Sequence, residues 1–130
     1  MTSTLRGDHL SAARPKLWRV TQRATFSALR RDGHRARRGP LTVTWLAPAP
    51  DELAAPPRVA FAIGRSVGGA VVRNRIRRRL RSAMGELHRH GGLPAGSYLL
   101  SGDARLATLP WSELVALTTD LVASATGSAA

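Results

Sequence analysis

Residues 65–81 have the sequence RSVGGAVVRNRIRRRLR, the most informative pattern in the chain. Seven of its seventeen residues are arginine and none is acidic. From Ala70 onward the apolar residues recur at the spacing of an amphipathic helix, and this pattern continues to about Arg89. The apolar stripe comprises Val72, Ile76, Leu80, Ala83 or Met84, and Leu87. The pattern therefore predicts a helix over residues 70–89 with one buried face.

The rest of the helix surface carries a fan of guanidinium groups. With about 100° per residue, one polar side comprises Asn74, Arg77, Arg78 and Arg81, while Arg75 and Arg79 flank the stripe on its other side. These like charges repel one another, and a phosphate backbone relieves the repulsion. Gly68 and Gly69 precede the helix, whose first backbone N–H groups are open to an anion. A merely solvated basic face is the alternative, but such faces usually carry acids among the bases.

The whole chain is strongly basic. Its 130 residues include 20 lysines and arginines against eight acids, a net charge of +12, and all but Arg105 of these bases lie before residue 93. Such a surplus favours polyanions, and arginine binds phosphate in a bidentate manner, although a GC-rich genome would also explain the preference for arginine over lysine. Cysteine is absent, which excludes disulfides and thiolate metal sites. No apolar run predicts a membrane span or a secretory signal.

The remaining pattern predicts a single α+β domain with a central sheet of about four strands. Helices are expected over residues 22–31, ended by Gly33, and 110–125. Strands are expected at residues 41–45, 59–63 and 98–100. A hairpin across the loop 47–57 is the simplest connection between the first two strands. Residues 1–15 are predicted to be a disordered basic arm, 16–125 the folded domain and 126–130 a frayed tail.

The segment GRSVGGAVVRNRIRRRLR, residues 64–81, resembles the signature of the bacterial ribonuclease P protein component family. The Arg-Asn-Arg triplet at residues 73–75, followed by a basic run, matches the core of that signature. A weaker resemblance extends over residues 19–122 and includes Phe26 and Gly33. The resemblance implies a ribonuclease P protein-like fold, with a left-handed βαβ crossover through the basic helix.

The resemblance also implies a function. The chain would be the protein subunit of ribonuclease P, a ribonucleoprotein endonuclease that removes the 5′ leader of precursor tRNA in tRNA processing. In that family the RNA subunit performs the hydrolysis with Mg²⁺, which is bound mainly by the RNA and the substrate. The expected partners are therefore the catalytic RNA and precursor tRNA, in the cytoplasm, with no membrane and no obligate protein partner. The protein itself would bind and position, without catalytic or metal-binding residues of its own.

The residue-level match names the candidate contacts. The candidates for RNA binding are Arg65, Arg73, Asn74, Arg75, Arg77, Arg78 and Arg81. Phe26 matches an aromatic of the cleft that holds the leader, although core packing of Phe26 is an equal alternative. Arg30 and Thr44 stand where further aromatics are common in the family, so Arg30 is expected to act on the leader by charge.

No set of residues in the sequence predicts hydrolytic chemistry by the chain alone. The four histidines lack metal-ligand partners at useful spacing, and no carboxylate pair or serine triad is evident. Two other functions share the basic character. One is a ribosomal-type structural RNA-binding protein, and the other is a double-stranded DNA binder that uses residues 70–89 as a recognition helix.

Overall fold

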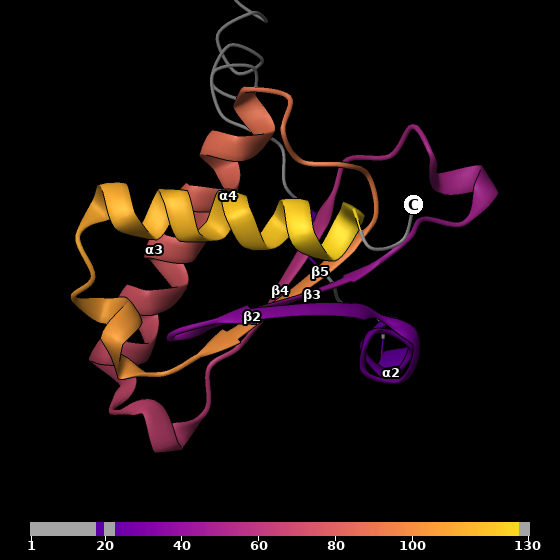
Figure 1. The fold of residues 1–130 in the computed structure, drawn as a ribbon. Coiled ribbons are helices and arrows are strands. Elements are labelled where there is room, and N and C mark those ends of the chain that lie inside the picture. Colours follow the sequence, from indigo (N-terminus) through magenta and orange to yellow (C-terminus); the bar gives the residue numbers. More distant parts are fainter. Residues whose placement is uncertain (1–17, 20–22, 128–130) are drawn as a thin grey trace, which may run out of the picture.

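The structure, a computed structural model, describes residues 18–19 and 23–127 (Figure 1). These residues form one mixed sheet in the order β1-β4-β5-β3-β2, together with three α-helices and three short 3₁₀ helices. The strands are β1 (Trp18–Arg19), β2 (His34–Arg38), β3 (Leu41–Leu46), β4 (Arg58–Ala62) and β5 (Ser97–Gly102). The α-helices are α2 (Arg23–Asp32), α3 (Ala70–Arg89) and α4 (Trp111–Gly127). The 3₁₀ helices are η1 (Pro50–Glu52), η2 (Arg65–Val67) and η3 (Ala104–Ala107).

This architecture confirms the predicted single α+β domain, with four main strands and a fifth of two residues. The predicted arm, residues 1–15, lies outside the described residues. The last helix continues to Gly127, so residues 126–127 belong to α4 rather than to a frayed tail. Among the described residues, no helix is long and apolar enough to span a membrane.

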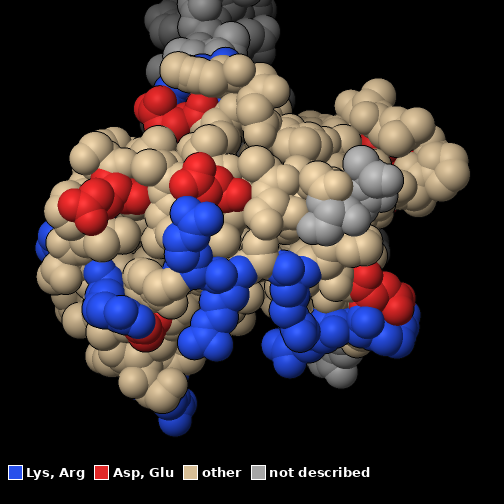
Figure 2. All heavy atoms as spheres, in the orientation of Figure 1, with Lys and Arg blue, Asp and Glu red and all other residues tan. Residues whose placement is uncertain are grey.

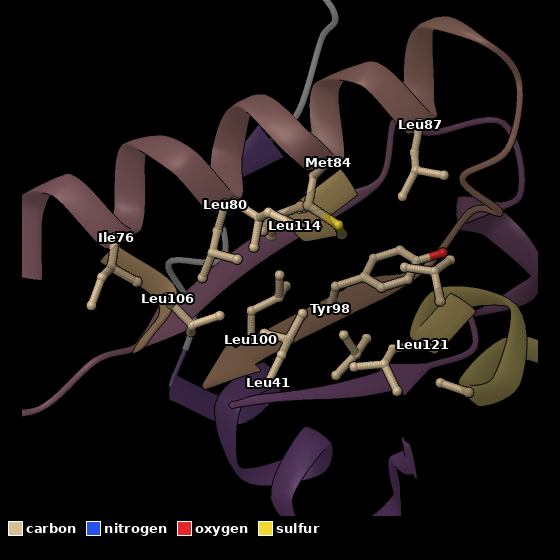
Figure 3. Packing of buried hydrophobic residues seen from close by; sticks show 14 of the residues in the cluster. Leu41, Ile76, Leu80, Met84, Leu87, Tyr98, Leu100, Leu106, Leu114 and Leu121 are labelled. Carbon is tan, nitrogen blue, oxygen red and sulfur yellow. The ribbon is translucent and has the colours of Figure 1, made fainter. Parts of the chain in front are cut away.

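The helices cover the two faces of the sheet unequally. Figure 1 shows α3 and α4 on one face and α2 on the other. The larger core lies between the sheet and the pair α3 and α4, where Figure 3 shows Ile76, Leu80 and Met84 of α3 directed toward the sheet. Each of these three side chains is fully buried and contributes roughly 1.5–3 kcal/mol by removal from water. The predicted apolar stripe is therefore what fixes α3 to the sheet.

The bounds of α3 agree with the prediction. The helix begins directly after Gly69 and ends at Arg89, and Gly91 follows with a φ of +75°, a left-handed conformation that favours glycine. The backbone N–H of Gly92 then donates to the carbonyl of Leu87 at 2.8 Å. The helix joins β4 to its parallel neighbour β5. The left-handedness of this crossover stays a prediction.

The predicted hairpin between the strands at 41–45 and 59–63 is wrong. These strands, β3 and β4, are not neighbours, because β5 lies between them and pairs with both. The first four residues of β5 are buried. A strand that is buried on both faces is most stable in the centre of a sheet. The hairpin partner of β3 is instead β2, a strand that the sequence pattern did not predict. A two-residue turn joins them, in which Gly39 has a φ of +56°.

Gly33 ends α2, as predicted, but by close approach rather than by a left-handed conformation. Its N–H donates to the carbonyl of Leu29 at 3.1 Å. A Cβ at this position would lie 2.5 Å from the Leu29 oxygen and 2.5 Å from Cγ2 of Thr44. Glycine therefore lets α2 end against β3, and it places Thr44 in the interior, only 3% exposed.

Candidate nucleic-acid interface

The arginines of α3 differ in how far the protein itself engages them. Four of them donate to backbone carbonyls of neighbouring segments: Arg73 to Gly68 (3.1 Å), Arg75 to Ala107 (3.0 Å), Arg77 to Ile63 (3.2 Å), and Arg79 to both Leu106 (2.5 Å) and Leu109. These bonds tie the helix to η2, to the end of β4 and to η3. A guanidinium has five N–H donors, so each of these side chains retains donors for a ligand.

Two candidate arginines make no such bond. Arg78 and Arg65 are exposed and have no hydrogen bond or ion pair with any residue that the structure describes. Arg81 differs, because its guanidinium lies over the ring of Phe61, 5.2 Å from the centroid. Asn74 is exposed and accepts a hydrogen bond from Arg77 at 3.0 Å. The first acid of α3 is Glu86, whose partners in the described part of the chain are Arg89 and His90, so the charges of residues 73–81 are not neutralised on their own helix.

One groove lies between α2, β4 and α3, and we call it the Phe26 groove. It has a volume of about 380 Å³. Its lining comprises Phe26, Val59, Ala60, Phe61, Arg77, Arg78 and Arg81. The structure thus brings a candidate aromatic together with three of the candidate arginines, although they come from segments about 50 residues apart in the chain.

Phe26 lies at the border between the core and the groove. It is half-buried, packs against the small cluster of Leu29, Ala60 and Leu99, and also lines the groove. Phe61 is a second half-buried aromatic in the groove. It was not among the predicted candidates, because a phenylalanine within an apolar strand predicts a core residue. Whether either ring contacts RNA stays a prediction.

The other two residues at family aromatic positions do not line this groove. Arg30 is exposed on α2, and its carbonyl accepts a hydrogen bond from Arg35 at 3.3 Å. Thr44 is buried beside Gly33. Arg30 is not among the described residues that line the groove, so its action on the leader stays a prediction.

A second groove lies on the other side of Arg78, between α3 and the start of α4, and we call it the Trp111 groove. It has a volume of about 400 Å³. Its lining comprises Arg75, Arg78, Arg79, Ser82 and Trp111. Arg78 lines both grooves, so it forms the ridge between them.

A third group of basic residues lies on the edge strand β2, where Arg35, Arg37 and Arg38 are exposed. Figure 2 shows basic side chains gathered on the lower part of one face, where β2 and α2 lie in Figure 1. This group is partly neutralised, since Arg38 forms an ion pair with Asp120 of α4 at 3.1 Å. Charged residues on an open edge strand also prevent edge-to-edge pairing, which gives β2 a structural role without any ligand.

Neither a metal centre nor a hydrolytic site is visible in the described part of the chain. No three potential ligand residues cluster there. Tyr98 and Asp103 have shifted pKa values, and both lie outside the two grooves. Burial raises the pKa of Tyr98 well above its usual range, and its hydroxyl donates to the carbonyl of Pro94 at 2.5 Å. The hydrogen bonds from Arg105 lower the pKa of the exposed Asp103. What the two grooves offer a ligand is the positive charge of their arginines, which suits an anion.

Comparison with known protein families gives one match over most of the chain. Residues 15–126 match the family described as ribonuclease P. Among curated proteins, the ribonuclease P protein component of Thermobifida fusca is 46% identical over 103 residues, 75% of this chain and 69% of that protein. That of Streptomyces avermitilis is 41% identical over 70% of this chain and 81% of the relative.

Solved structures show the same fold at low sequence identity. The ribonuclease P protein of Thermotoga maritima superposes with a TM-score of 0.66, at 17% identity, over 80% of this chain and 94% of its own. The Staphylococcus aureus protein gives a TM-score of 0.63, at 18% identity, over 88% of this chain and 96% of its own. Both likenesses support the arrangement of the sheet and helices described above.

Proposed function

The chain belongs to the ribonuclease P protein family, and from this premise we propose that its α3 arginines bind the catalytic RNA while the Phe26 groove holds the 5′ leader of precursor tRNA. Members of the family are subunits of a ribonucleoprotein endoribonuclease that acts in tRNA processing. The relatives and solved structures compared above are ribonuclease P proteins, which favours this function over the ribosomal and DNA-binding alternatives.

The observation that carries this proposal is the Phe26 groove. Two aromatic rings line it, and Arg77, Arg78 and Arg81 lie along one side. Single-stranded nucleic acid binds where bases stack on aromatic rings and the backbone follows cations, and a base stack of this kind contributes about 1–3 kcal/mol. A duplex presents no free base faces, so the groove favours an unpaired leader over the tRNA body.

The hydrolytic step would belong to the RNA. The described residues offer cations and aromatics but no cluster of acidic ligands, so Mg²⁺ would be bound by the catalytic RNA and the substrate. The protein would raise the effective affinity for Mg²⁺ by neutralising and positioning phosphates. It would act in the cytoplasm on precursor tRNA, with no membrane and no obligate protein partner.

The proposal is tested by reconstitution with a bacterial ribonuclease P RNA at low Mg²⁺. The protein should enable cleavage at the mature 5′ end, whereas the nuclease-free protein alone should not cleave. Cleavage by the protein alone would contradict the assignment of catalysis to RNA.

The leader site is tested by affinity for precursor and mature tRNA. Phe26→Ala and Phe61→Ala should each weaken binding of the precursor by about 1–3 kcal/mol and leave binding of mature tRNA nearly unchanged. Arg105→Ala is a surface control, because Arg105 is exposed, forms an ion pair with Asp103 and lies outside both grooves. If folded variants of both phenylalanines discriminate precursor from mature tRNA as well as the parent does, the leader does not lie in this groove.

A further inference from the structure

We propose that the Trp111 groove is a separate RNA site, which holds an unpaired nucleotide of the catalytic RNA with its base on the indole ring and its phosphates on Arg75 and Arg78. This inference rests on the proposed function, because it assumes that α3 lies against the catalytic RNA. It assigns a role to a residue that neither the composition nor the arginine pattern singled out.

The first argument is the exposure of Trp111. The indole is 43% exposed at the first residue of α4, whereas the core of the described chain holds most other large apolar side chains. The anchor of α4 is instead Leu114, which is fully buried. The indole N–H has no hydrogen-bond partner among the described residues. Packing of the helix therefore does not require tryptophan here, while an exposed ring with a free donor suits a nucleotide.

The second argument is the rigidity of the segment that leads to Trp111. Arg75 and Arg79 donate to three carbonyls of this segment, those of Ala107, Leu106 and Leu109. The first turn of α4 is closed by the N–H of Leu114, which donates to the carbonyl of Pro110 at 2.9 Å. Because the segment is bonded to α3 before any ligand arrives, little conformational freedom would be lost on binding.

The third argument is the charge around the ring. Arg75 uses only its Nε–H on Ala107, so its terminal amino groups remain available to a phosphate. Arg78 has all five donors available within the described structure, and Ser82 adds an exposed hydroxyl. No acidic side chain is among the residues described as lining the groove. An aromatic ring flanked by cations in this way selects a nucleotide over an apolar peptide.

The fourth argument concerns which RNA is bound. On α3 the side chains of Arg77 and Arg81 lie on the side of the Phe26 groove, and those of Arg75 and Arg79 lie on the side of α4. The helix itself therefore separates the two grooves. A leader in the Phe26 groove would have to cross the ridge at Arg78 to reach Trp111, so the second nucleotide is assigned to the catalytic RNA.

The test measures binding of the catalytic RNA alone, in the absence of any precursor. Trp111→Leu keeps an apolar side chain but removes the stacking surface, and it should weaken this binding by about 5- to 150-fold, the worth of one base stack. Trp111→Phe should restore most of the affinity. Leu53→Ala is a matched control, because Leu53 is an exposed apolar residue after η1, outside both grooves, and it should bind as the parent does.

Chemical probing of the catalytic RNA distinguishes loss of this site from loss of folding, because an unfolded variant would lose the whole footprint. The parent protein should protect one unpaired base, and Trp111→Leu should lose that protection while the rest of the footprint remains. Unchanged affinity and footprint in Trp111→Leu would overturn the site. If the variant instead loses discrimination between precursor and mature tRNA, the nucleotide comes from the precursor, and the assignment to the catalytic RNA is wrong. Failure of the leader site would appear separately, in the Phe26 and Phe61 variants.

Discussion

Replacement of Arg79 by methionine should destabilise the protein, and the same replacement at Arg78 should not. Both changes remove one positive charge from the same helix and keep an unbranched apolar chain. They differ in what the guanidinium does in the folded protein. Arg79 donates to the carbonyls of Leu106 and Leu109, whereas Arg78 makes no hydrogen bond within the described structure.

The magnitude follows from these two bonds. A hydrogen bond from a charged donor contributes about 1.5–3 kcal/mol. Because Arg79 is only half-buried, water can partly replace it at the carbonyls, and the lower end of that range applies to each bond. The expected loss is therefore about 3 kcal/mol, which lowers the melting temperature of a domain of this size by roughly 10 °C. The melting temperature of Arg78→Met should equal or exceed that of the parent, because removal of an unpaired charge relieves repulsion within α3.

Thermal melting of the two variants at the same ionic strength checks the first half of this prediction, and titration of RNA binding against salt checks the second. Arg78→Met should reduce the salt slope by about 0.7–0.9 for the phosphate contact it loses. Arg79→Met should reduce the slope less, because both terminal nitrogens of Arg79 already donate to carbonyls of the protein. Equal melting temperatures for the two variants would refute the reasoning, because the carbonyl bonds of Arg79 would then contribute nothing to folding.

Three further predictions concern the fold. Gly33→Ala should lower the free energy of unfolding, measured by urea titration, by about 1–3 kcal/mol, because the new methyl group would overpack against Leu29 and Thr44. Gly64→Ala is the control, because a Cβ at that position meets no atom within 4 Å. Tyr98 is the only tyrosine of the chain, and burial raises its pKa in the folded state. Its contribution to the free energy of unfolding is therefore fully present below the ordinary tyrosine pKa of about 10. That contribution is lost as the pH rises above this value, because only the unfolded chain then releases the proton. Tyrosinate absorbance should therefore appear only with unfolding, and its appearance near pH 10 in folded protein would contradict this. Moderate sulfate at constant pH should raise the melting temperature by screening the α3 arginines, and an unchanged melting curve would show that their repulsion is negligible.

The features that could be predicted from the sequence are those that depend on neighbouring residues. The bounds of α3 were predicted because its apolar stripe and its flanking glycines lie within one continuous segment. The edge strand β2 was missed because its sequence, HRARR, has no apolar alternation. It is a strand only because β3 offers a partner and the Gly39 turn brings the two together.

The candidate site shows the same limit. Helical spacing predicted which arginines lie off the apolar stripe of α3. It could not predict which of them would be bonded to the protein, because the accepting carbonyls belong to η3 and to the end of β4. Phe61 and Trp111 became candidates only once the fold had placed them beside Arg81 and Arg75.

The central position of β5 has a consequence for synthesis on the ribosome. Its neighbours β3 and β4 precede it by 50 and 35 residues or more, and neither can complete its pairing before Ser97–Gly102 has been made. Until then the nascent chain holds two separate half-sheets, β1 with β4 and β2 with β3. A product truncated before residue 97 would therefore expose two apolar edges at once, and such a fragment would be a substrate for chaperones and proteases rather than a smaller folded protein.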